Sequence, residues 1–177
     1  FFQFNIKLLT ILLFTIMSTK TVKASKSNFI TLKTSKGSII IKTLPKIAPN
    51  HVKRIKELVS SGFYNGIIFH RVIEGFMAQT GDPLGNGTGG SGKNLKAEFS
   101  DYKYKYGTVG MARSMNPDSG DSQFFICFDG CGHLTGQYTV WGQVETGMEV
   151  VEKIEIGEPP SNPDQIIEAF VGKKKTK

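Results

Sequence analysis

The sequence lacks the residue patterns on which most covalent and metal-dependent enzymes rely. Ser122 and three histidines are present, but no serine stands in a G-x-S-x-G element. A zinc site needs three or four clustered ligands, and Cys131 with His133 is the only close pair of candidates. These absences argue against a serine hydrolase and against a metal enzyme.

Cysteine occurs only twice, as Cys127 and Cys131. Their C-x3-C spacing differs from the C-x-x-C spacing of redox motifs. A disulfide requires Cα atoms within about 7 Å, which is a demanding condition for a strand residue and a turn residue at this spacing. The favoured interpretation is one buried strand cysteine and one loop cysteine, both free. A disulfide is the alternative in an oxidising compartment.

Acidic residues are outnumbered, since 15 Asp and Glu face 22 Lys and Arg and the formal net charge is +7. Such an excess often indicates nucleic-acid binding. Here the excess lies at the two ends of the chain, and without those seven lysines the basic count falls to 15, equal to the acidic count. We therefore expect no nucleic-acid binding, and a solvated basic tail at residues 173–177. The seven are Lys7, Lys20, Lys23, Lys173, Lys174, Lys175 and Lys177.

Long apolar runs are also missing, apart from Leu8–Met17 near the N-terminus. Lys7 precedes this run, and a polar stretch after it ends in Val22-Lys23-Ala24, which fits a small-residue cleavage site. We expect residues 1–24 to be a signal peptide and the protein to be exported, either periplasmic or secreted. The alternative is an uncleaved membrane anchor, although a span needs about 20 apolar residues. The remainder, residues 25–172, has the length of one domain.

The body of the chain is rich in short segments with β-strand character. Phe29–Thr34 alternates apolar and polar residues, and β-branched residues resume after the turn at Ser35-Lys36-Gly37, which predicts a hairpin with Ser38–Leu44. Further apolar runs are separated by glycine-containing breaks, and we expect strands there. These runs are Ile67–Arg71, Gly75–Gln79, Thr108–Ala112, Ser122–Phe128, Thr139–Val144 and, last, Ile166–Val171.

Two helices are expected among these strands. Pro49 suits a first helical position, and Val52, Ile55 and Val59 then form one apolar face, up to Gly62. A shorter helix is expected over Met148–Ile154. A closed antiparallel barrel with two helices over its ends fits this pattern, and a mostly antiparallel sandwich fits it nearly as well.

The glycine-rich segment Gly85–Gly90 matches G-x-G-x-x-G, and Gly87–Asn94 nearly matches a P-loop. Neither context supports nucleotide binding. Gly81-Asp82-Pro83 precedes the glycines where a dinucleotide loop requires a buried parallel strand, and Asn94 lacks the hydroxyl that would bind magnesium. We expect a flexible surface loop in which glycine supplies positive φ angles.

The most distinctive stretch, Phe69–Pro83, reads FHRVIEGFMAQTGDP. On composition alone it would be a buried strand and turn with Arg71 reaching solvent. Together with GTGG at residues 87–90 and SQFFI at residues 122–126, however, it resembles the bacterial-like cyclophilins over residues 29–170. The resemblance implies a closed eight-stranded antiparallel β-barrel capped by two α-helices, and a peptidyl-prolyl cis–trans isomerase that needs no cofactor.

The resemblance also implies the site. Rotation about an X-Pro bond breaks amide resonance, and a donor aimed at the prolyl nitrogen binds the twisted amide better than the planar one. Arg71 matches the catalytic arginine, and Phe76 matches a residue of the proline pocket that acts with it. Gln79 matches a glutamine that hydrogen-bonds the substrate backbone and helps to position the arginine. If residues 69–71 continue a strand, His70 points to the face opposite Arg71. The substrate groove is implied to be lined by Met77, Ala112, Arg113, Gln123, Phe125, Leu134 and Tyr138.

Three positions depart from common members of the family. Tyr138 replaces a histidine at the pocket edge, and Arg113 replaces an asparagine, which should change substrate preference. His133 replaces a tryptophan important for cyclosporin, so we expect weak cyclosporin binding at most. The expected partners are proline-containing polypeptides, with the protein a monomer that assists the folding of exported proteins. A module that grips proline peptides without turnover, or a surface protein, is the alternative.

Overall fold

The computed structural model describes residues 27–173. The predicted signal peptide at residues 1–24 and residues 174–177 of the predicted tail lie outside the described residues. Within the described part of the chain, no helix combines the length and the hydrophobicity needed to cross a bilayer.

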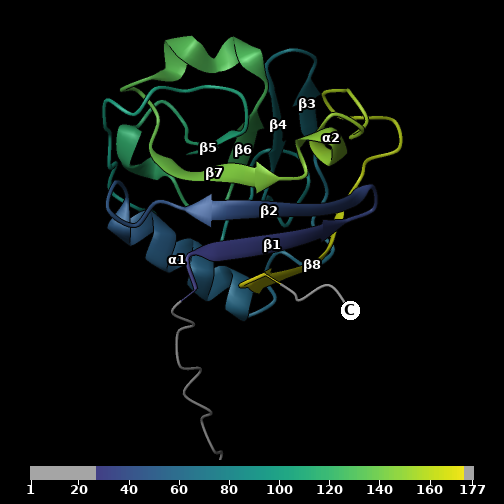
Figure 1. Cartoon of the computed structure of the whole chain (residues 1–177), viewed down its shortest axis with the longest axis horizontal. Helices are drawn as coiled ribbons and strands as arrows, with labels where there is room; N and C mark the ends of the chain where they lie inside the picture. The colour runs from purple at the N-terminus through teal and green to yellow at the C-terminus, as the bar shows by residue number, and fades with distance from the viewer. Residues whose placement is uncertain (1–26, 174–177) are drawn as a thin grey trace, which may run out of the picture.

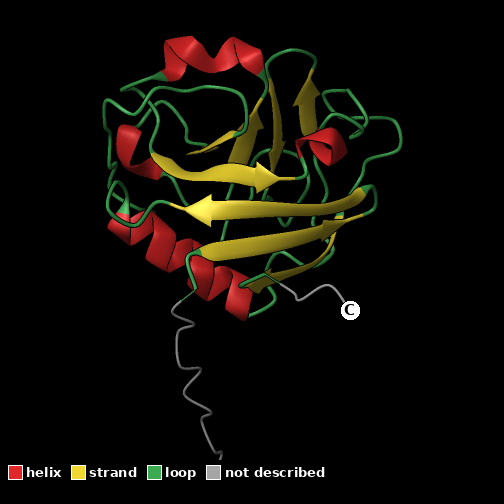
Figure 2. Cartoon of the chain, viewed as in Figure 1, coloured by secondary structure: helices red, strands yellow, loops and turns green. Residues whose placement is uncertain are grey.

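The strands form one antiparallel sheet that curves into an open half-barrel (Figures 1 and 2). Its order is β3-β4-β6-β5-β7-β2-β1-β8, so β3 and β8 are edges that do not pair with each other. The predicted eight antiparallel strands and two α-helices are confirmed, whereas the closed barrel is not. The strands are β1 (Phe29–Thr34), β2 (Gly37–Thr43), β3 (Arg71–Ile73), β4 (Met77–Thr80), β5 (Thr108–Met111), β6 (Phe124–Cys127), β7 (Val140–Thr146) and β8 (Ile166–Val171).

The hairpin of β1 and β2 and the helix α1 (Pro49–Ser60) follow the sequence pattern closely. The predicted apolar face of α1, including Val52 and Ile55, is buried, and the helix packs against β7 and β8. No side chain caps the helix locally; instead Glu98, from a distant loop, accepts hydrogen bonds from the backbone N–H groups of Asn50 and His51, both at 3.0 Å. The second helix, α2 (Met148–Val151), is shorter than predicted and packs against β2.

The predicted strand Ile67–Arg71 is wrong, since β3 only begins at Arg71. The residues before β3 form irregular hydrogen bonds to the segment before β8 instead. The backbone N–H of Phe69, for example, donates to the backbone carbonyl oxygen of Asp164 at 2.8 Å. One isolated bridge pairs Ile68 with Gln165 and another pairs Val72 with Gly157. These contacts bring the loop between α2 and β8 beside β3, which matters for the site described below.

Strand β6 serves two packing clusters because successive side chains point to opposite faces. Phe124 and Ile126 belong to the main core beneath the sheet, together with Trp141. Phe125 and Cys127 face the other way, into a smaller cluster. That cluster also contains Met77, Tyr104, Cys131, Leu134 and Val140.

Cys127 and Cys131 form a disulfide, which corrects the interpretation that both are free. The 3-10 helix η2 (Asp129–Leu134) turns the chain back after β6 and brings the two Cα atoms to 6.0 Å. The bond therefore ties η2, which carries His133 and Leu134, to β6.

Removing this crosslink is expected to lower the free energy of unfolding by about 2 kcal/mol, the entropic value for a very short loop. Urea unfolding with and without reductant measures the effect, and the double variant Cys127→Ala/Cys131→Ala is the control because it should not respond to reductant. Two titratable thiols in the unreduced protein, with no response to reductant, would contradict the assignment.

Candidate functional site

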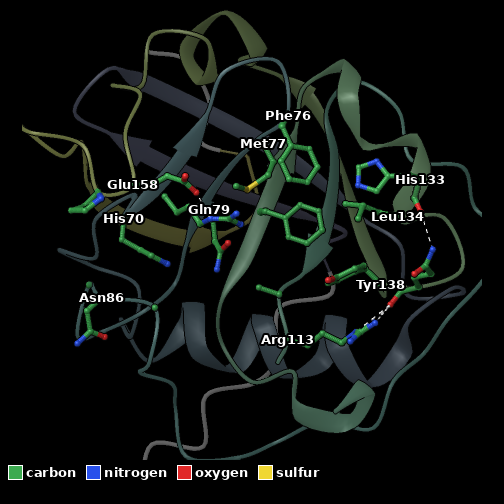
Figure 3. A pocket seen from close by; sticks show the side chains of 17 residues that line it. His70, Phe76, Met77, Gln79, Asn86, Arg113, His133, Leu134, Tyr138 and Glu158 are labelled. Atoms are coloured by element: carbon green, nitrogen blue, oxygen red, sulfur yellow. Dashed lines mark hydrogen bonds and ion pairs between the residues drawn. The ribbon is translucent and has the colours of Figure 1, made fainter. Parts of the chain in front are cut away.

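A groove of about 790 Å³ opens on the face of the sheet where β3, β4 and β6 meet η2. Figure 3 shows Glu158 and His70 on one side of it and His133, Leu134 and Tyr138 on the other. Nine of the ten predicted site residues line this groove, and only Gln123 does not. The nine are Arg71, Phe76, Met77, Gln79, Ala112, Arg113, Phe125, Leu134 and Tyr138.

The floor of the groove is apolar and built from rings. The Phe125 side chain is only 4% exposed; its ring stacks on Tyr104 at 5.9 Å and meets Tyr138 edge-on at 5.9 Å. Burial raises the pKa of Tyr104 well above its usual value, so this ring stays uncharged. Gly110 makes room for the stack, because a Cβ there would lie 2.5 Å from Phe125 Cζ. The result is an apolar floor built from packed aromatic rings.

Arg71 provides the positive charge at the rim. It is the first residue of the edge strand β3, and its side chain is 44% exposed. Its Nε donates to Glu158 Oε1 at 2.6 Å, across 87 positions of sequence. Glu158 is a site residue that the sequence analysis missed, because Gly157-Glu158-Pro159-Pro160 reads as an ordinary loop.

Gln79 stands opposite Arg71 in the β3–β4 register, but the two side chains do not hydrogen-bond to each other. Its Nε2 donates to Gln123 Oε1 at 3.0 Å. The Gln123 amide donates in turn to the carbonyl oxygens of Gly87 at 3.0 Å and Gly89 at 2.8 Å. The Gln79 amide is thus held, through Gln123, by the glycine-rich loop, and its role in positioning the arginine stays a prediction.

The glycine-rich loop wraps around Asp82 rather than presenting its N–H groups to a phosphate. The carboxylate accepts hydrogen bonds from the backbone N–H groups of Leu84 at 2.8 Å and Asn86 at 3.0 Å, and also from that of Gly87. Burial alone would raise the pKa of Asp82, but these backbone donors outweigh it and lower the pKa. Gly89 has to be glycine, since a Cβ there would clash with the carboxylate. The Asp82 carboxylate thus occupies three backbone N–H donors of the glycine-rich loop.

The far rim is shaped by the two departures at Arg113 and Tyr138. The Arg113 guanidinium lies 4.4 Å from the centroid of the Tyr138 ring. It donates to the carbonyl oxygen of Gln137 through Nε at 3.1 Å and through Nη2 at 2.8 Å. The Arg113 guanidinium is therefore held by contacts with Gln137 and Tyr138, and Arg113 forms a wall of the groove.

His133 stacks on Phe76 with the ring centroids 5.5 Å apart, which places a small flat ring at the edge of the groove.

His70 also lines the groove, which corrects the expectation that it faces away from Arg71. It lies just before β3, where the backbone is irregular, and it is only 6% exposed. Burial, aided by Arg71 and opposed by Asp82, lowers the pKa of His70 and favours the neutral ring.

Among residues 27–173 there is no cluster of three or more His, Cys, Asp or Glu side chains that could hold a metal ion. The groove brings the Arg71 guanidinium and the Gln79 amide together beside an apolar floor.

Comparison with known proteins agrees with this geometry. Residues 29–171 match the model of the family described as cyclophilin type peptidyl-prolyl cis-trans isomerase/CLD. A probable peptidyl-prolyl cis-trans isomerase of Brucella abortus is 49% identical over 165 residues, which is 84% of each chain. A peptidyl-prolyl cis-trans isomerase of Helicobacter pylori is 43% identical over 143 residues, 78% of this chain and 87% of that one.

Solved structures show the same fold. A Cryptosporidium parvum cyclophilin crystallised in the presence of the dipeptide Ala-Pro superposes with a TM-score of 0.76 at 27% identity, over 82% of this chain and 99% of that one. A cyclophilin from Hirschia baltica gives a TM-score of 0.75 at 29% identity, over 84% of this chain and 75% of that one.

Proposed function

The chain belongs to the cyclophilin-type peptidyl-prolyl cis–trans isomerase family and is an enzyme of that class, and from this premise we propose that Arg71 catalyses the rotation. The observation that carries the proposal is the position of Arg71, at the rim of an apolar slot formed by Phe76, Met77 and Phe125.

The physical reason is the nature of the barrier. In the planar amide the prolyl nitrogen shares its lone pair with the carbonyl group, and about 18–20 kcal/mol is needed to rotate the bond. At the twisted transition state the lone pair returns to nitrogen, which can then accept a hydrogen bond. A guanidinium aimed at that nitrogen stabilises the twisted state selectively, and only such selective binding accelerates the reaction.

The other residues hold the peptide while it rotates. The slot of Phe76, Met77 and Phe125, with Leu134, takes the proline ring and excludes water, so the field of Arg71 is less screened than in solution. Gln79, whose amide is already anchored on Gln123, offers its oxygen to the substrate backbone. Ala112, Arg113 and Tyr138 form the wall along which the neighbouring residues lie.

The direct test is exchange NMR on a short Ala-Pro peptide. We expect micromolar protein to accelerate cis–trans exchange, which takes tens of seconds or longer without a catalyst. An unchanged exchange rate together with peptide binding would mean that the groove holds proline peptides without turnover.

We further propose that the protein is exported, acts as a monomer and assists the folding of exported proteins. The apolar run before Val22-Lys23-Ala24 supports export, and so does the disulfide, which is typical of oxidising compartments. Mass spectrometry of the mature N-terminus should show cleavage after Ala24, and light scattering should give the mass of one chain. Uncleaved protein in the membrane fraction would contradict export.

Cyclosporin is expected to inhibit weakly, because His133 offers less flat surface than a tryptophan at this position. An inhibition assay on an X-Pro peptide should give a constant far above the nanomolar range, and His133→Trp should lower it. Nanomolar inhibition of the unmodified protein would contradict this expectation.

A further inference from the structure

We propose that Glu158 is a positioning residue for the reaction, and that it holds the Arg71 guanidinium in the orientation needed at the prolyl nitrogen. The inference rests on the catalytic role proposed for Arg71. Among residues 27–173, Glu158 is the only hydrogen-bond or ion-pair partner of the Arg71 side chain. Gln79, the expected partner, bonds to Gln123 instead.

Hydrogen bonds hold the backbone beside Glu158, so the position from which its side chain extends is fixed. Gly157 and Val72 exchange backbone hydrogen bonds of 2.8 and 2.9 Å, which attach the segment to β3 one residue from Arg71. Figure 1 shows this loop, in yellow, passing beside β3 on its way to β8. Gly157 has a φ of +156°, and an added Cβ would lie 2.5 Å from Pro160 Cα, so only glycine suits the turn.

A second anchor holds the far end of the loop. Asp164 is buried and accepts a hydrogen bond from the backbone N–H of Glu155 at 2.9 Å and another from the Ser35 hydroxyl at 2.6 Å. The loop that presents Glu158 is thus attached on both sides of it, to β3 and to the β1–β2 hairpin. A carboxylate on a loop held in this way can fix the orientation of the arginine side chain that it binds.

The geometry of the ion pair suits this role. Glu158 occupies the Nε–H of Arg71, and the two terminal nitrogens of the rigid guanidinium fork remain available to the groove. An unpaired arginine at an exposed strand edge would sample many rotamers and lose that freedom in each turnover. Because the pair is about half exposed, solvent screens the charge of the carboxylate and Arg71 keeps most of its effect on a ligand.

Glu158→Ala is expected to lower kcat for an X-Pro peptide about threefold to fivefold, the size of a well-formed exposed ion pair. KM should not change, because the planar ground-state amide has no free lone pair for Arg71 to bind. Glu158→Gln, which keeps an acceptor oxygen without the charge, should restore part of the loss. In ¹H–¹⁵N spectra the Arg71 Nε–H resonance should be protected from exchange in the unmodified protein and lose protection in Glu158→Ala.

A double-mutant cycle with Arg71→Ala separates this inference from the proposed function. If Glu158 acts through Arg71, then Glu158→Ala should have no further effect once Arg71 is alanine. Glu74→Gln is the matched control for loss of a negative charge, since Glu74 is exposed in the turn after β3, away from the groove, and should leave kcat unchanged.

Each outcome has one meaning. A loss of activity in Arg71→Ala with unchanged kcat in Glu158→Ala overturns the positioning role and leaves the proposed function in place. A loss from Glu158→Ala that persists in the Arg71→Ala background also overturns it. Full activity of Arg71→Ala overturns the proposed function itself.

Discussion

Arg71→Ala is expected to lower kcat/KM for an X-Pro peptide by about 100-fold, the scale observed when one preorganised donor is removed from an active site. This corresponds to about 2.7 kcal/mol of transition-state stabilisation. The loss should appear in kcat, because the planar amide gains little from the guanidinium before it twists. Exchange NMR at several substrate concentrations measures kcat and KM separately.

The substitution should leave the fold intact. Arg71 is exposed at the start of an edge strand, and surface substitutions there change the free energy of unfolding by about 0.5 kcal/mol or less. Arg71→Lys keeps the positive charge but has no planar fork, so it should recover only a small part of the activity. If Lys restores full activity, a point charge is sufficient and the directed hydrogen bond to nitrogen is wrong.

Arg113→Ala is the informative comparison within the same groove. The Arg113 guanidinium is engaged by the carbonyl oxygen of Gln137 and by the Tyr138 ring, so it cannot approach the reacting nitrogen as Arg71 can. We expect this variant to change KM and substrate preference while kcat stays near its original value. Equal losses of kcat in Arg71→Ala and Arg113→Ala would mean that kcat depends on the total positive charge of the groove and not on Arg71 in particular.

The sequence predicted local structure well where a single pattern decided it. The apolar face of Val52, Ile55 and Val59 and the alternation in Phe29–Thr34 depend only on neighbouring residues, and both α1 and β1 form as expected. The strand predicted at Ile67–Arg71 failed because these residues bond to Asp164 and Gln165, whose position depends on the whole sheet.

The same distinction explains what was missed at the site. The FHRVIEGFMAQTGD stretch predicted Arg71 and Gln79 as site residues, and both line the groove. Glu158 could not be inferred, because its loop meets β3 only after the chain has folded. The disulfide depended on the tight turn of η2, and the spacing of Cys127 and Cys131 alone does not reveal that turn.

Phe125→Ala is expected to have the largest combined effect on stability and activity. The side chain is almost completely buried, and Phe-to-Ala truncation in such positions costs about 3–5 kcal/mol of unfolding free energy. The floor of the proposed proline slot would be lost at the same time, because the stack with Tyr104 and the edge contact with Tyr138 both depend on this ring. Urea unfolding and exchange NMR on the same preparation measure the two effects.

Since the alanine variant is at risk of unfolding, Phe125→Leu is the variant that tests the role of the slot. Leucine keeps an apolar floor and most of the volume, so the stability loss should be about 1–2 kcal/mol. The ring contacts disappear, and we expect kcat/KM to fall about tenfold, mainly through KM, since one fitted apolar contact is worth about 1–3 kcal/mol in substrate binding.

Phe124→Leu is the matched control, because strand alternation directs the adjacent ring into the main core. Phe124 packs edge-on against Tyr64 and Trp141, at 5.5 and 5.3 Å, and does not line the groove. It should lose stability to a similar degree while each folded molecule keeps its activity. If the two leucine variants lose activity equally, the deficit reflects general loosening of β6; if Phe125→Leu keeps full activity, the ring is not the floor of the proline slot. A loss of activity in Phe125→Leu alone would indicate that the reaction takes place on the face of β6 that Phe125 shares with Cys127.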